Sequence, residues 1–337
     1  MAGKSGLTGD VVKEYLARFP HAGARTLANK IYAENSALYT DSEHVRRVIL
    51  YYIGQSGKAN RSVLRDTRFV RPAGDGKANP WGIPESDAIP WAPVHIPERF
   101  NNGLVFSDSH YPYHDVQAFD SMINQAVNWK PNFILINGDG MDCYQGSKFN
   151  RDVRNRSISD EIWGWIELLN VLKNAFPGVK IYWKLGNHEE RWENYLRVKA
   201  PELLDMSEFK LKEIIKIRGL EGVEVVERQI IYTGRFPWLH GHELPGGAAS
   251  PVSPARGLAL KTLTSSAVSH HHKTSAQTAV DLNGKLMSWY SIACMCELHP
   301  EYALINSWNH GFARIQTEGL EFEFENYKIY NGKVYHD

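Results

Sequence analysis

The sequence predicts an α/β fold in which central mixed β-sheets are flanked by helices, with a small all-α module at the N-terminus. Two observations predict this class. Apolar residues recur at helical spacing over residues 9–54, whereas from about residue 99 short apolar runs of the buried-strand type alternate with amphipathic helices. Such alternation implies a sheet covered by helices, with polar functional residues at the carboxyl ends of its strands.

Length, charge and cysteine content narrow the class of protein. The 337 residues can bury a sizeable core as one large domain or two smaller ones. The chain has 38 Lys+Arg and 38 Asp+Glu, so its net charge indicates no acidic or basic partner. Three cysteines cannot build a disulfide framework, and no signal peptide or apolar run of membrane-spanning length is visible. We therefore expect a cytoplasmic protein without a membrane segment.

The N-terminal module is expected to contain three helices. They are predicted over residues 9–20, over Ala24–Asn35, and from Ser42, as the N-cap, to Gly54. We therefore predict a three-helix module over residues 1–57. Residues 58–98 are rich in Gly, Pro and Asn with little periodicity, and we predict a linker there. The remaining residues, 99–337, form the predicted α/β domain.

The elements of the α/β domain follow from its apolar pattern. Apolar runs of the buried-strand type occur at Leu104–Phe106, Phe133–Ile136 and Lys180–Lys184, and the amphipathic stretches Asp115–Trp129 and Ser157–Phe176 are predicted helices. Beyond residue 276 the predicted strands are Leu286–Ile292, Ala303–Ser307, Phe312–Gln316 and Glu321–Glu325, with turns at Glu318-Gly319 and Asn331-Gly332. Cys294 and Cys296 alternate in this part, and we interpret them as strand residues rather than metal ligands.

Five polar clusters between residues 108 and 272 carry the chemistry. They are Asp108-Ser-His110, Gly138-Asp139-Gly-Met-Asp142, Gly186-Asn187-His188-Glu189, His240-Gly241-His242 and His270-His271-His272. Imidazole, carboxylate and amide oxygen together suit Mn, Fe, Zn or Ni. Each cluster alone is more often a turn, a cap or a surface tract. All five in this order indicate a two-metal centre that hydrolyses phosphate esters.

The chemistry of this reaction gives some residues a role. Hydrolysis needs a nucleophilic hydroxide and compensation for charge on the phosphoryl oxygens, and two divalent cations about 3.5–4 Å apart supply both. A bridging carboxylate holds two cations at that separation. Asp139, on a tight Gly-Asp-Gly turn after a buried strand, is the best candidate. Asp108 and His110 can face one ion, and Asn187 can offer its amide oxygen to the other.

The motifs over about residues 100–275 resemble those of the calcineurin-like metallophosphoesterase superfamily, which are DxH, GDxxD, GNH(D/E), a lone His and GHxH. The resemblance implies an α-β-β-α sandwich and two divalent ions, with Mn²⁺ expected. It implies that one metal is held by Asp108, His110, Asp139 and His272 and the second by Asp139, Asn187, His240 and His270. His188 would face the leaving group as general acid or electrostatic stabiliser, oriented by Asp142.

The chain departs from the family pattern at two positions. Ser269 replaces the glycine of GHxH, although a serine can be accommodated there. Cys143 stands where the protein Ser/Thr phosphatases and dinucleoside-polyphosphate hydrolases of the superfamily have Arg, which argues against those branches. The lone family histidine corresponds to His240, and His242 then supports the ligands or faces the substrate.

Candidate substrate-binding residues are Lys148, Arg151, Arg191 and His242. The three cations follow ligand clusters and can neutralise phosphate oxygens, and guanidinium suits bidentate contact. A solvated charge or a salt bridge is an equally good interpretation of each.

The N-terminal module suggests a nucleic-acid partner. Residues 1–72 carry 12 Lys/Arg against 6 Asp/Glu, and Arg46-Arg47 lies on the third helix. The layout resembles a helix-turn-helix module and the front segment of phage-encoded metallophosphoesterases, which would place the protein in the host cytoplasm. Residues 1–57 are then expected to deliver the α/β domain to DNA or RNA. A helical docking or oligomerisation module is the equally weighted alternative.

The leading hypothesis is a dinuclear, Mn²⁺-type phosphodiesterase or nuclease that acts on nucleic acid or nucleotide-derived substrates through a metal-bridging hydroxide. A phosphomonoesterase is the alternative within the enzyme class. The alternative from another class is a non-catalytic nucleic-acid-binding or assembly protein that retains the fold as a scaffold. The complete ligand set argues against a scaffold, which does not require Asn187 and His188.

Overall fold

A computed structural model describes residues 6–20, 22–64, 66–71, 91–147, 157–204, 206–218, 222–244, 252–300, 303–319 and 321–336. The chain divides into two compact units, Met1–Pro90 and Trp91–Asp337. The boundary between them falls within the range predicted as a linker. No helix in the described part of the chain is long and apolar enough to cross a membrane.

The first unit is helical, as the periodicity predicts. Its helices are α1 (Leu7–Arg18), α2 (Ala24–Glu34), the 3₁₀ turn η1 (Ser36–Leu38), α3 (Ser42–Tyr52) and α4 (Lys58–Val63). Apolar residues four apart on successive helices form its core, among them Val12, Leu27, Ile31, Val45 and Ile49.

Three details of this unit differ from the sequence prediction. The N-cap of α3 is Asp41 rather than Ser42, because the Asp41 carboxylate accepts the backbone N–H of His44 at 2.6 Å. The connection from α2 to α3, residues 35–41, is longer than the turn of about three or four residues in a helix-turn-helix motif. Helix α4 lies inside the predicted linker, and residues 72–90 of that linker are outside the described residues.

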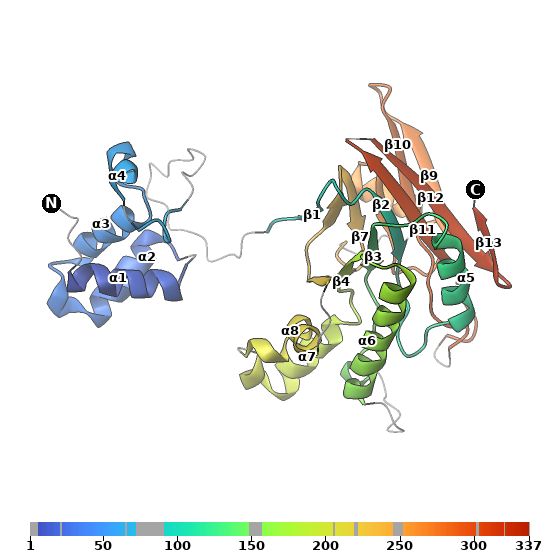
Figure 1. Cartoon of the computed structure of the whole chain (residues 1–337), viewed down its shortest axis with the longest axis horizontal. Coiled ribbons are helices and arrows are strands. Elements are labelled where there is room, and N and C mark those ends of the chain that lie inside the picture. The colour runs from blue at the N-terminus through green and yellow to red at the C-terminus, as the bar shows by residue number, and fades with distance from the viewer. Residues whose placement is uncertain are drawn as a thin grey trace. The chain divides into compact units, whose positions relative to one another are not determined.

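The second unit contains two sheets (Figure 1). One has the order β13-β12-β11-β2-β3-β4-β5, and its strands are β2 (Asn102–Phe106), β3 (Phe133–Asn137), β4 (Lys180–Lys184), β5 (Val223–Val226), β11 (His310–Glu318), β12 (Glu321–Tyr330) and β13 (Lys333–His336). The other has the order β1-β6-β7-β8-β10-β9, and its strands are β1 (Val94–Ile96), β6 (Ile231–Thr233), β7 (Phe236–Leu239), β8 (Ser266–Val268), β9 (Ser275–Val280) and β10 (Leu286–Ser291).

Helices connect and cover these sheets. They are α5 (Val116–Ala126), α6 (Ile158–Ala175), α7 (Glu190–Lys199), α8 (Leu211–Ile217) and α9 (Pro254–Thr262), with short 3₁₀ turns η2 (Tyr144–Gly146), η3 (Pro201–Leu203) and η4 (Ser207–Phe209). Helices α5 and α6 lie against the sheet that contains β2, β3 and β4 (Figure 1).

Alternation along the central strands produces the layers. In β2, Leu104 packs with the α5 and α6 side chains, whereas its neighbour Val105 packs with Trp238 of the other sheet. On the far side of that second sheet, Leu258 of α9 packs with Trp289. The order helix, sheet, sheet, helix is an α-β-β-α sandwich, so the predicted fold class is confirmed.

Most elements of the second unit lie where the sequence predicts them, with one exception. Residues 303–307 form no strand. Leu304 and Ile305 are 67% and 99% exposed, so this short apolar run does not enter the core. Asn306 holds the loop instead, because its side-chain amide donates to the carbonyl of Ala303 at 2.7 Å. The predicted turns at Gly319 and Asn331-Gly332 are confirmed by positive φ at all three residues.

The topology brings the polar clusters to one place. Strands β2, β3 and β4 are parallel neighbours in one sheet, and β7 and β8 are parallel neighbours in the other. Each of these strands ends one to three residues before a ligand cluster. Because parallel strands end at the same sheet edge, the five clusters meet where the two sheets face each other.

Candidate metal centre

Three loops of the first sheet form one wall of the site. Asp108, Asp139 and Asn187 follow β2, β3 and β4. The backbone N–H of Asp108 donates to Gly138 O at 3.0 Å, and the N–H of His188 donates to Asp139 Oδ1 at 2.9 Å. These bonds fix the spacing of the loops before any ion is considered.

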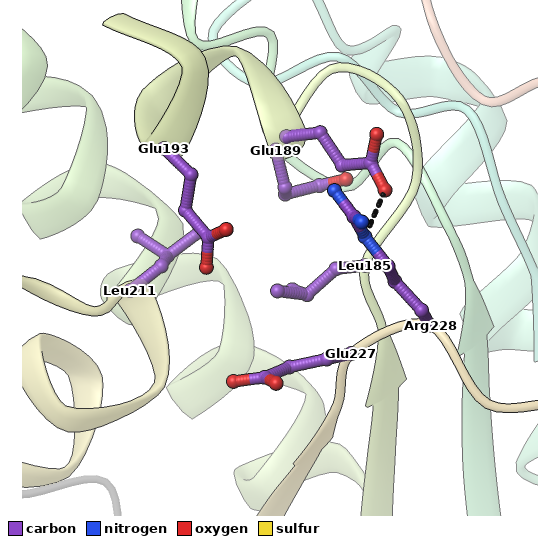
Figure 2. A pocket seen from close by; sticks show the side chains of 7 residues that line it. Leu185, Glu189, Glu193, Leu211, Glu227 and Arg228 are labelled. Carbon is purple, nitrogen blue, oxygen red and sulfur yellow. Dashed lines mark hydrogen bonds and ion pairs between the residues drawn. The ribbon is translucent and has the colours of Figure 1, made fainter. Parts of the chain in front are cut away.

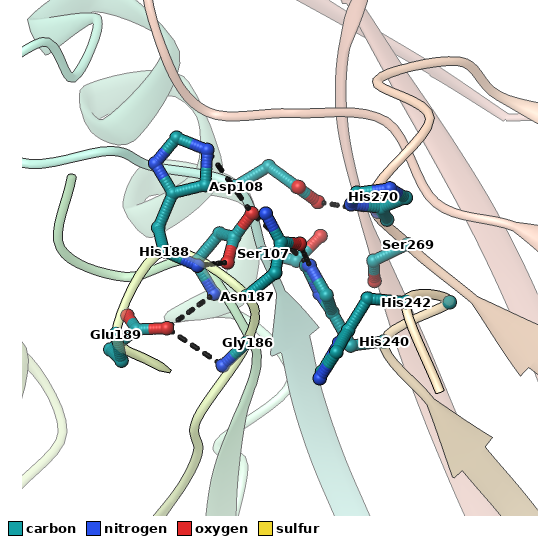
Figure 3. Close-up of polar contacts among 12 residues, drawn as sticks. Ser107, Asp108, Gly186, Asn187, His188, Glu189, His240, His242, Ser269 and His270 are labelled. Atoms are coloured by element: carbon teal, nitrogen blue, oxygen red, sulfur yellow. Dashed lines mark hydrogen bonds and ion pairs between the residues drawn. The ribbon is translucent and has the colours of Figure 1, made fainter. Parts of the chain in front are cut away.

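Two loops of the second sheet form the facing wall (Figure 3). The backbone N–H of His270 donates to Asp108 Oδ2 at 3.0 Å, which joins the sheets. The buried hydroxyl of Ser269 accepts the side-chain amide of Asn137 at 2.9 Å. The serine that replaces the family glycine is thus accommodated by a hydrogen bond.

One set of donor atoms lies around Asp108. His272 Nε2 is 3.3 Å from Asp108 Oδ1 and 3.1 Å from His110 Nε2. His110 Nε2 is in turn 3.9 Å from Asp139 Oδ2. These are the four residues that the family resemblance assigns to one metal.

A second set lies around His240. Its Nε2 is 3.1 Å from Asp139 Oδ2 and 3.2 Å from Asn187 Oδ1. A carbonyl only accepts hydrogen bonds, so the contact of 2.8 Å between His240 Nδ1 and Asn137 O places a proton on Nδ1. In the neutral ring, Nε2 then has no proton, and its lone pair is available to a metal ion. Donor atoms of His270 lie within 4.8 Å of those of Asp139 and His240. Asp139 is therefore common to both sets.

The donor atoms fit divalent cations. Two donors about 2.1 Å from one ion lie roughly 3 to 3.5 Å apart at octahedral to tetrahedral angles, and the closest pairs in both sets have this spacing. Asp108 Oδ1 is fully buried and, among the described residues, has no hydrogen-bond donor. An orphaned carboxylate oxygen between imidazole nitrogens is explained by a cation.

The backbone at the site is unusual. Nine non-glycine residues among those described have positive φ, and five of them are predicted ligands, Asp108, His110, Asp139, His270 and His272. Side chains with a Cβ rarely adopt this left-handed conformation, and where it occurs in a cluster it marks a functional site. The conformation turns successive side chains of short loops toward one centre.

Attraction between opposite charges in the site outweighs the effect of burial on the pKa values of Asp139 and His240. Burial raises the pKa of Asp139, but the neighbouring His240 and His188 outweigh this and hold the pKa well below its usual range. Burial lowers the pKa of His240, and the carboxylate of Asp139 raises it to about 10. A proton on His240 thus takes the place of a cation, and metal binding must release that proton.

Asp142 and His188 form a pair beside the donor sets. His188 Nδ1 donates to Asp142 Oδ1 at 2.9 Å. Arg191 contacts both residues, since Nη1 donates to the backbone carbonyl of Asp142 at 2.9 Å and Nη2 lies 2.8 Å from His188 Nε2. Of the proposed substrate-binding cations, Arg191 is therefore at the site, whereas Lys148 and Arg151 lie outside the described residues.

His242 does not join the donor sets. Its Nε2 lies 3.5 Å from Glu190 Oε1. Glu190 belongs to a small pocket beside the site (Figure 2), lined by Leu185, Glu189, Glu190, Glu193, Leu211, Glu227 and Arg228. Four carboxyl side chains against one guanidinium make this pocket unsuitable for a phosphate anion.

Two residues of the site were missed by the sequence reasoning. The carboxylate of Glu189 accepts the N–H groups of Asp139, Met141 and Gly186 at 3.1, 2.8 and 2.7 Å, so it fastens two ligand loops together. Its place in the GNH(D/E) motif was the available signal. Cys296 is fully buried after β10, with Sγ 3.9 Å from His272 Nδ1, which differs from the predicted strand position. No local pattern signals that contact.

Known proteins resemble the chain to different degrees. The family model for calcineurin-like phosphoesterases matches residues 104–277, which are 174 of the 337 residues. No curated protein sequence matches. Similar solved structures include Vps29 from Entamoeba histolytica, with 12% identity, a TM-score of 0.37 and coverage of 70% of this chain and 97% of that chain. Vacuolar Protein Sorting 29 from Cryptosporidium parvum has 16% identity and a TM-score of 0.40, with coverage of 70% of this chain and 95% of that chain. A dimetal phosphatase from Danio rerio has 11% identity and a TM-score of 0.33, with coverage of 68% of this chain and 95% of that chain.

Proposed function

The chain belongs to the calcineurin-like phosphoesterase family as a metal-dependent phosphoester hydrolase, and from this premise we propose that it hydrolyses phosphodiesters of nucleic acids or nucleotides with two divalent cations. The observation that carries the proposal is the position of Asp139. Its Oδ2 lies 3.9 Å from His110 Nε2 and 3.1 Å from His240 Nε2. These two rings in turn contact His272 and Asn187. A shared carboxylate between two donor sets is the arrangement that a dinuclear centre requires.

The residues that would hold the cations are those of the two donor sets. Asp108, His110 and His272 would share one ion with Asp139, and Asn187, His240 and His270 would share the other. When bound, the cations would neutralise the phosphoryl oxygens and lower the pKa of a water molecule. The donor types, which include several imidazoles, suit Mn²⁺, Fe²⁺ or Zn²⁺ better than Mg²⁺.

The remaining polar residues of the site have roles at the leaving group. The Asp142 carboxylate orients the His188 ring through Nδ1, so that Nε2 faces outward toward Arg191. Because a guanidinium only donates, Nε2 accepts from Arg191 here. Once Arg191 turns to the phosphate, Nε2 can take up a proton and pass it to the departing oxygen. The Arg191 guanidinium, 22% exposed and next to that nitrogen, can turn to the phosphate oxygens.

Two features support a diester as the substrate. A diester phosphate carries one negative charge, whereas a monoester carries close to two. Among the described residues, the guanidinium that contacts the His188–Asp142 pair is that of Arg191, and its single positive charge matches a diester. The helical unit adds a second feature, because Arg18, Arg25 and Arg47 are exposed and form no ion pair in the described part of the chain. Exposed cations on a small helical unit suit a phosphate backbone.

The proposal is tested by comparing bis(p-nitrophenyl) phosphate with p-nitrophenyl phosphate in the presence of Mn²⁺. We expect kcat/KM to be higher for the diester. Asp139→Asn should abolish both activities, because it weakens the binding of both ions. A higher kcat/KM for the monoester would indicate a phosphomonoesterase. Binding of DNA or RNA without hydrolysis of either ester would indicate the non-catalytic alternative.

A further inference from the structure

A fully buried lysine lies beside the metal centre and takes no part in the proposed chemistry. Lys184 is the last residue of β4, and its side chain has no exposed area. Its ammonium is 2.7 Å from Glu243 Oε1 and donates to the carbonyl of Gln229 at 2.8 Å. A buried ion pair is no more stabilising than well-packed apolar residues of the same volume. Stability alone therefore does not explain a charged pair at this position.

The carboxylate of Glu243 holds the turn that carries His240. Oε2 accepts the backbone N–H of Gly241 at 2.7 Å, and Oε1 accepts the N–H of His240 at 3.2 Å. The turn is tightly enclosed, because Gly241 has φ +130 and a Cβ there would lie 2.9 Å from Val268. The carboxylate thus fixes the backbone from which the His240 ring projects.

The ion pair connects the two sheets where the second donor set is assembled. Lys184 ends β4, three residues before Asn187, and Glu243 follows β7, three residues after His240. The two ligand atoms, Asn187 Oδ1 and His240 Nε2, are 3.2 Å apart. A displacement of the turn relative to β4 would change this distance directly.

The first donor set is joined across the sheets by other bonds. The N–H of His270 donates to Asp108 Oδ2 at 3.0 Å, and Asn137 donates to Ser269 Oγ at 2.9 Å. Neither bond involves the Lys184–Glu243 pair. These bonds link the two sets, because His270 belongs to the second set and the carbonyl of Asn137 also accepts from His240 Nδ1. In the described part of the chain, Glu243 contacts the backbone of His240, a second-set ligand, and of no first-set ligand.

We propose that the Lys184–Glu243 ion pair positions His240 for the second metal ion, and that the first metal ion does not depend on it. The inference rests on the proposed two-metal function, because it concerns the ligands of one of the two ions. Both members are positioning residues. They act through the His240 turn and the end of β4, and neither belongs to a donor set.

The test is metal binding by the full chain with both charges removed. Removing one partner would leave an uncompensated buried charge, so the double variant Lys184→Met/Glu243→Leu is used. Metal-free protein is titrated with Mn²⁺ and followed by elemental analysis and electron paramagnetic resonance. Wild type should bind two ions per chain and give an exchange-coupled spectrum. The variant should bind one ion with unchanged affinity, bind the second about 10- to 100-fold more weakly, and give a mononuclear spectrum at one equivalent.

A matched control lies on the same strand. Lys180 and Glu224 form a partly exposed ion pair of 3.3 Å at the other end of β4, so Lys180→Met/Glu224→Leu should keep both ions. If the Lys184→Met/Glu243→Leu variant does not fold, Lys184→Met/Glu243→Gln replaces it. Its amide oxygen still accepts from Gly241 and no buried charge is left unpaired, and the same selective weakening is expected. A folded variant that binds two ions as tightly as wild type overturns the inference, and so does equal loss of both ions. A wild type with fewer than two ions contradicts the proposed function itself.

Discussion

Asp139 is shared by both donor sets, whereas Asp142, His188 and Arg191 lie to one side of them. This separation distinguishes residues that would hold cations from residues that would act on the leaving group. It also means that single substitutions on the two sides should have different kinetic signatures. Substitutions in the donor sets should lower activity on every substrate. The effect of substituting Asp142, His188 or Arg191 should depend on the leaving group of the substrate.

His188→Ala tests the role at the leaving group. We expect kcat to fall by about 10²- to 10⁴-fold for a dinucleotide, whose alkoxide leaving group needs a proton. The fall should be much smaller for bis(p-nitrophenyl) phosphate, because p-nitrophenolate leaves without one. Steady-state kinetics on both substrates gives the comparison, with His242→Ala as the control outside the donor sets. Equal losses on both substrates would exclude proton donation by His188.

The carboxyl group of Glu161 lies beside the loop that carries Asp142, and its pKa makes the stability of the protein depend on pH. The Glu161 side chain is buried and accepts the backbone N–H of Cys143 at 2.5 Å. Burial raises its pKa to about 8, from 4.5. The folded protein therefore keeps a proton that the unfolded chain loses above about pH 4.5. The stability that this group contributes is complete below that pH and is lost as the pH rises through about 8.

Glu161→Gln should remove this pH dependence, because an amide does not titrate. The free energy of unfolding of wild type relative to the variant should decrease by about 3 to 5 kcal/mol between pH 5 and pH 8. Urea unfolding of metal-free protein at several pH values measures it. A difference between the two proteins that stays constant with pH would contradict the raised pKa.

Much of the residue-level site could be predicted because ligand chemistry is local in sequence. Asp108, Asp139 and Asn187 occur in short motifs after apolar runs, and the structure brings them together. Glu189 and Cys296 could not be assigned in the same way. Their partners are backbone groups and rings up to about fifty residues away, and only the folded loops define those contacts.

At the scale of elements, the site depends on how closely its loops pack. Gly138, between β3 and Asp139, has φ +95, and a Cβ there would lie 2.2 Å from Nδ1 of His240. The glycine thus allows a loop of one sheet to contact a ligand of the other. Gly178, before β4, has a similar φ of +79 but nothing within 4 Å.

Gly138→Ala and Gly178→Ala separate packing from backbone strain. Both replacements should cost about 1–2 kcal/mol for the left-handed conformation. Gly138→Ala should cost several kcal/mol more and lower metal binding, because the His240 ring must move. Urea unfolding and Mn²⁺ titration of both variants measure this. Equal destabilisation of the two variants with full metal binding would show that the contact at Gly138 is unimportant.

The sequence predicted the elements of the first half of the domain better than those of the second. Buried parallel strands such as β3 are continuous apolar runs, and a helix such as α6 has a clear period. Strands β1, β6 and β8 have three residues each, too few for a period to be recognised. The apolar pair Leu304 and Ile305 gave a wrong strand prediction because apolar residues in an exposed loop have the same local pattern.

At the scale of the whole molecule, the pairing of two sheets around the centre follows from contacts far apart in sequence. The alternation of strands and helices predicted one covered sheet, and the second sheet was expected only through the family resemblance. Strand β11, about two hundred residues after β2, is its direct neighbour. No local pattern specifies such a pairing, because it depends on which strand edges remain available after the early elements pack.

The helical unit gives a prediction at this scale. Replacing Arg18, Arg25 and Arg47 with Ala should weaken binding of DNA or RNA. The slope of the logarithm of the binding constant against the logarithm of the salt concentration should become shallower by about one for each phosphate that is no longer neutralised. Replacing Lys30, Arg46 and Arg68, which are ion-paired, removes the same charge and should have a smaller effect. Fluorescence anisotropy at several salt concentrations measures both variants. Equal effects would indicate that the unit has no specific phosphate-binding face.

The most direct test of the central claim is hydrolysis of bis(p-nitrophenyl) phosphate by metal-free protein during titration with Mn²⁺. Two cations that share Asp139 predict no turnover without metal, little at one equivalent, and a rate that saturates as the second equivalent binds. Chelation should reverse the gain. Full turnover at one equivalent, or no turnover with any divalent cation despite two bound ions, would contradict a dinuclear phosphodiesterase.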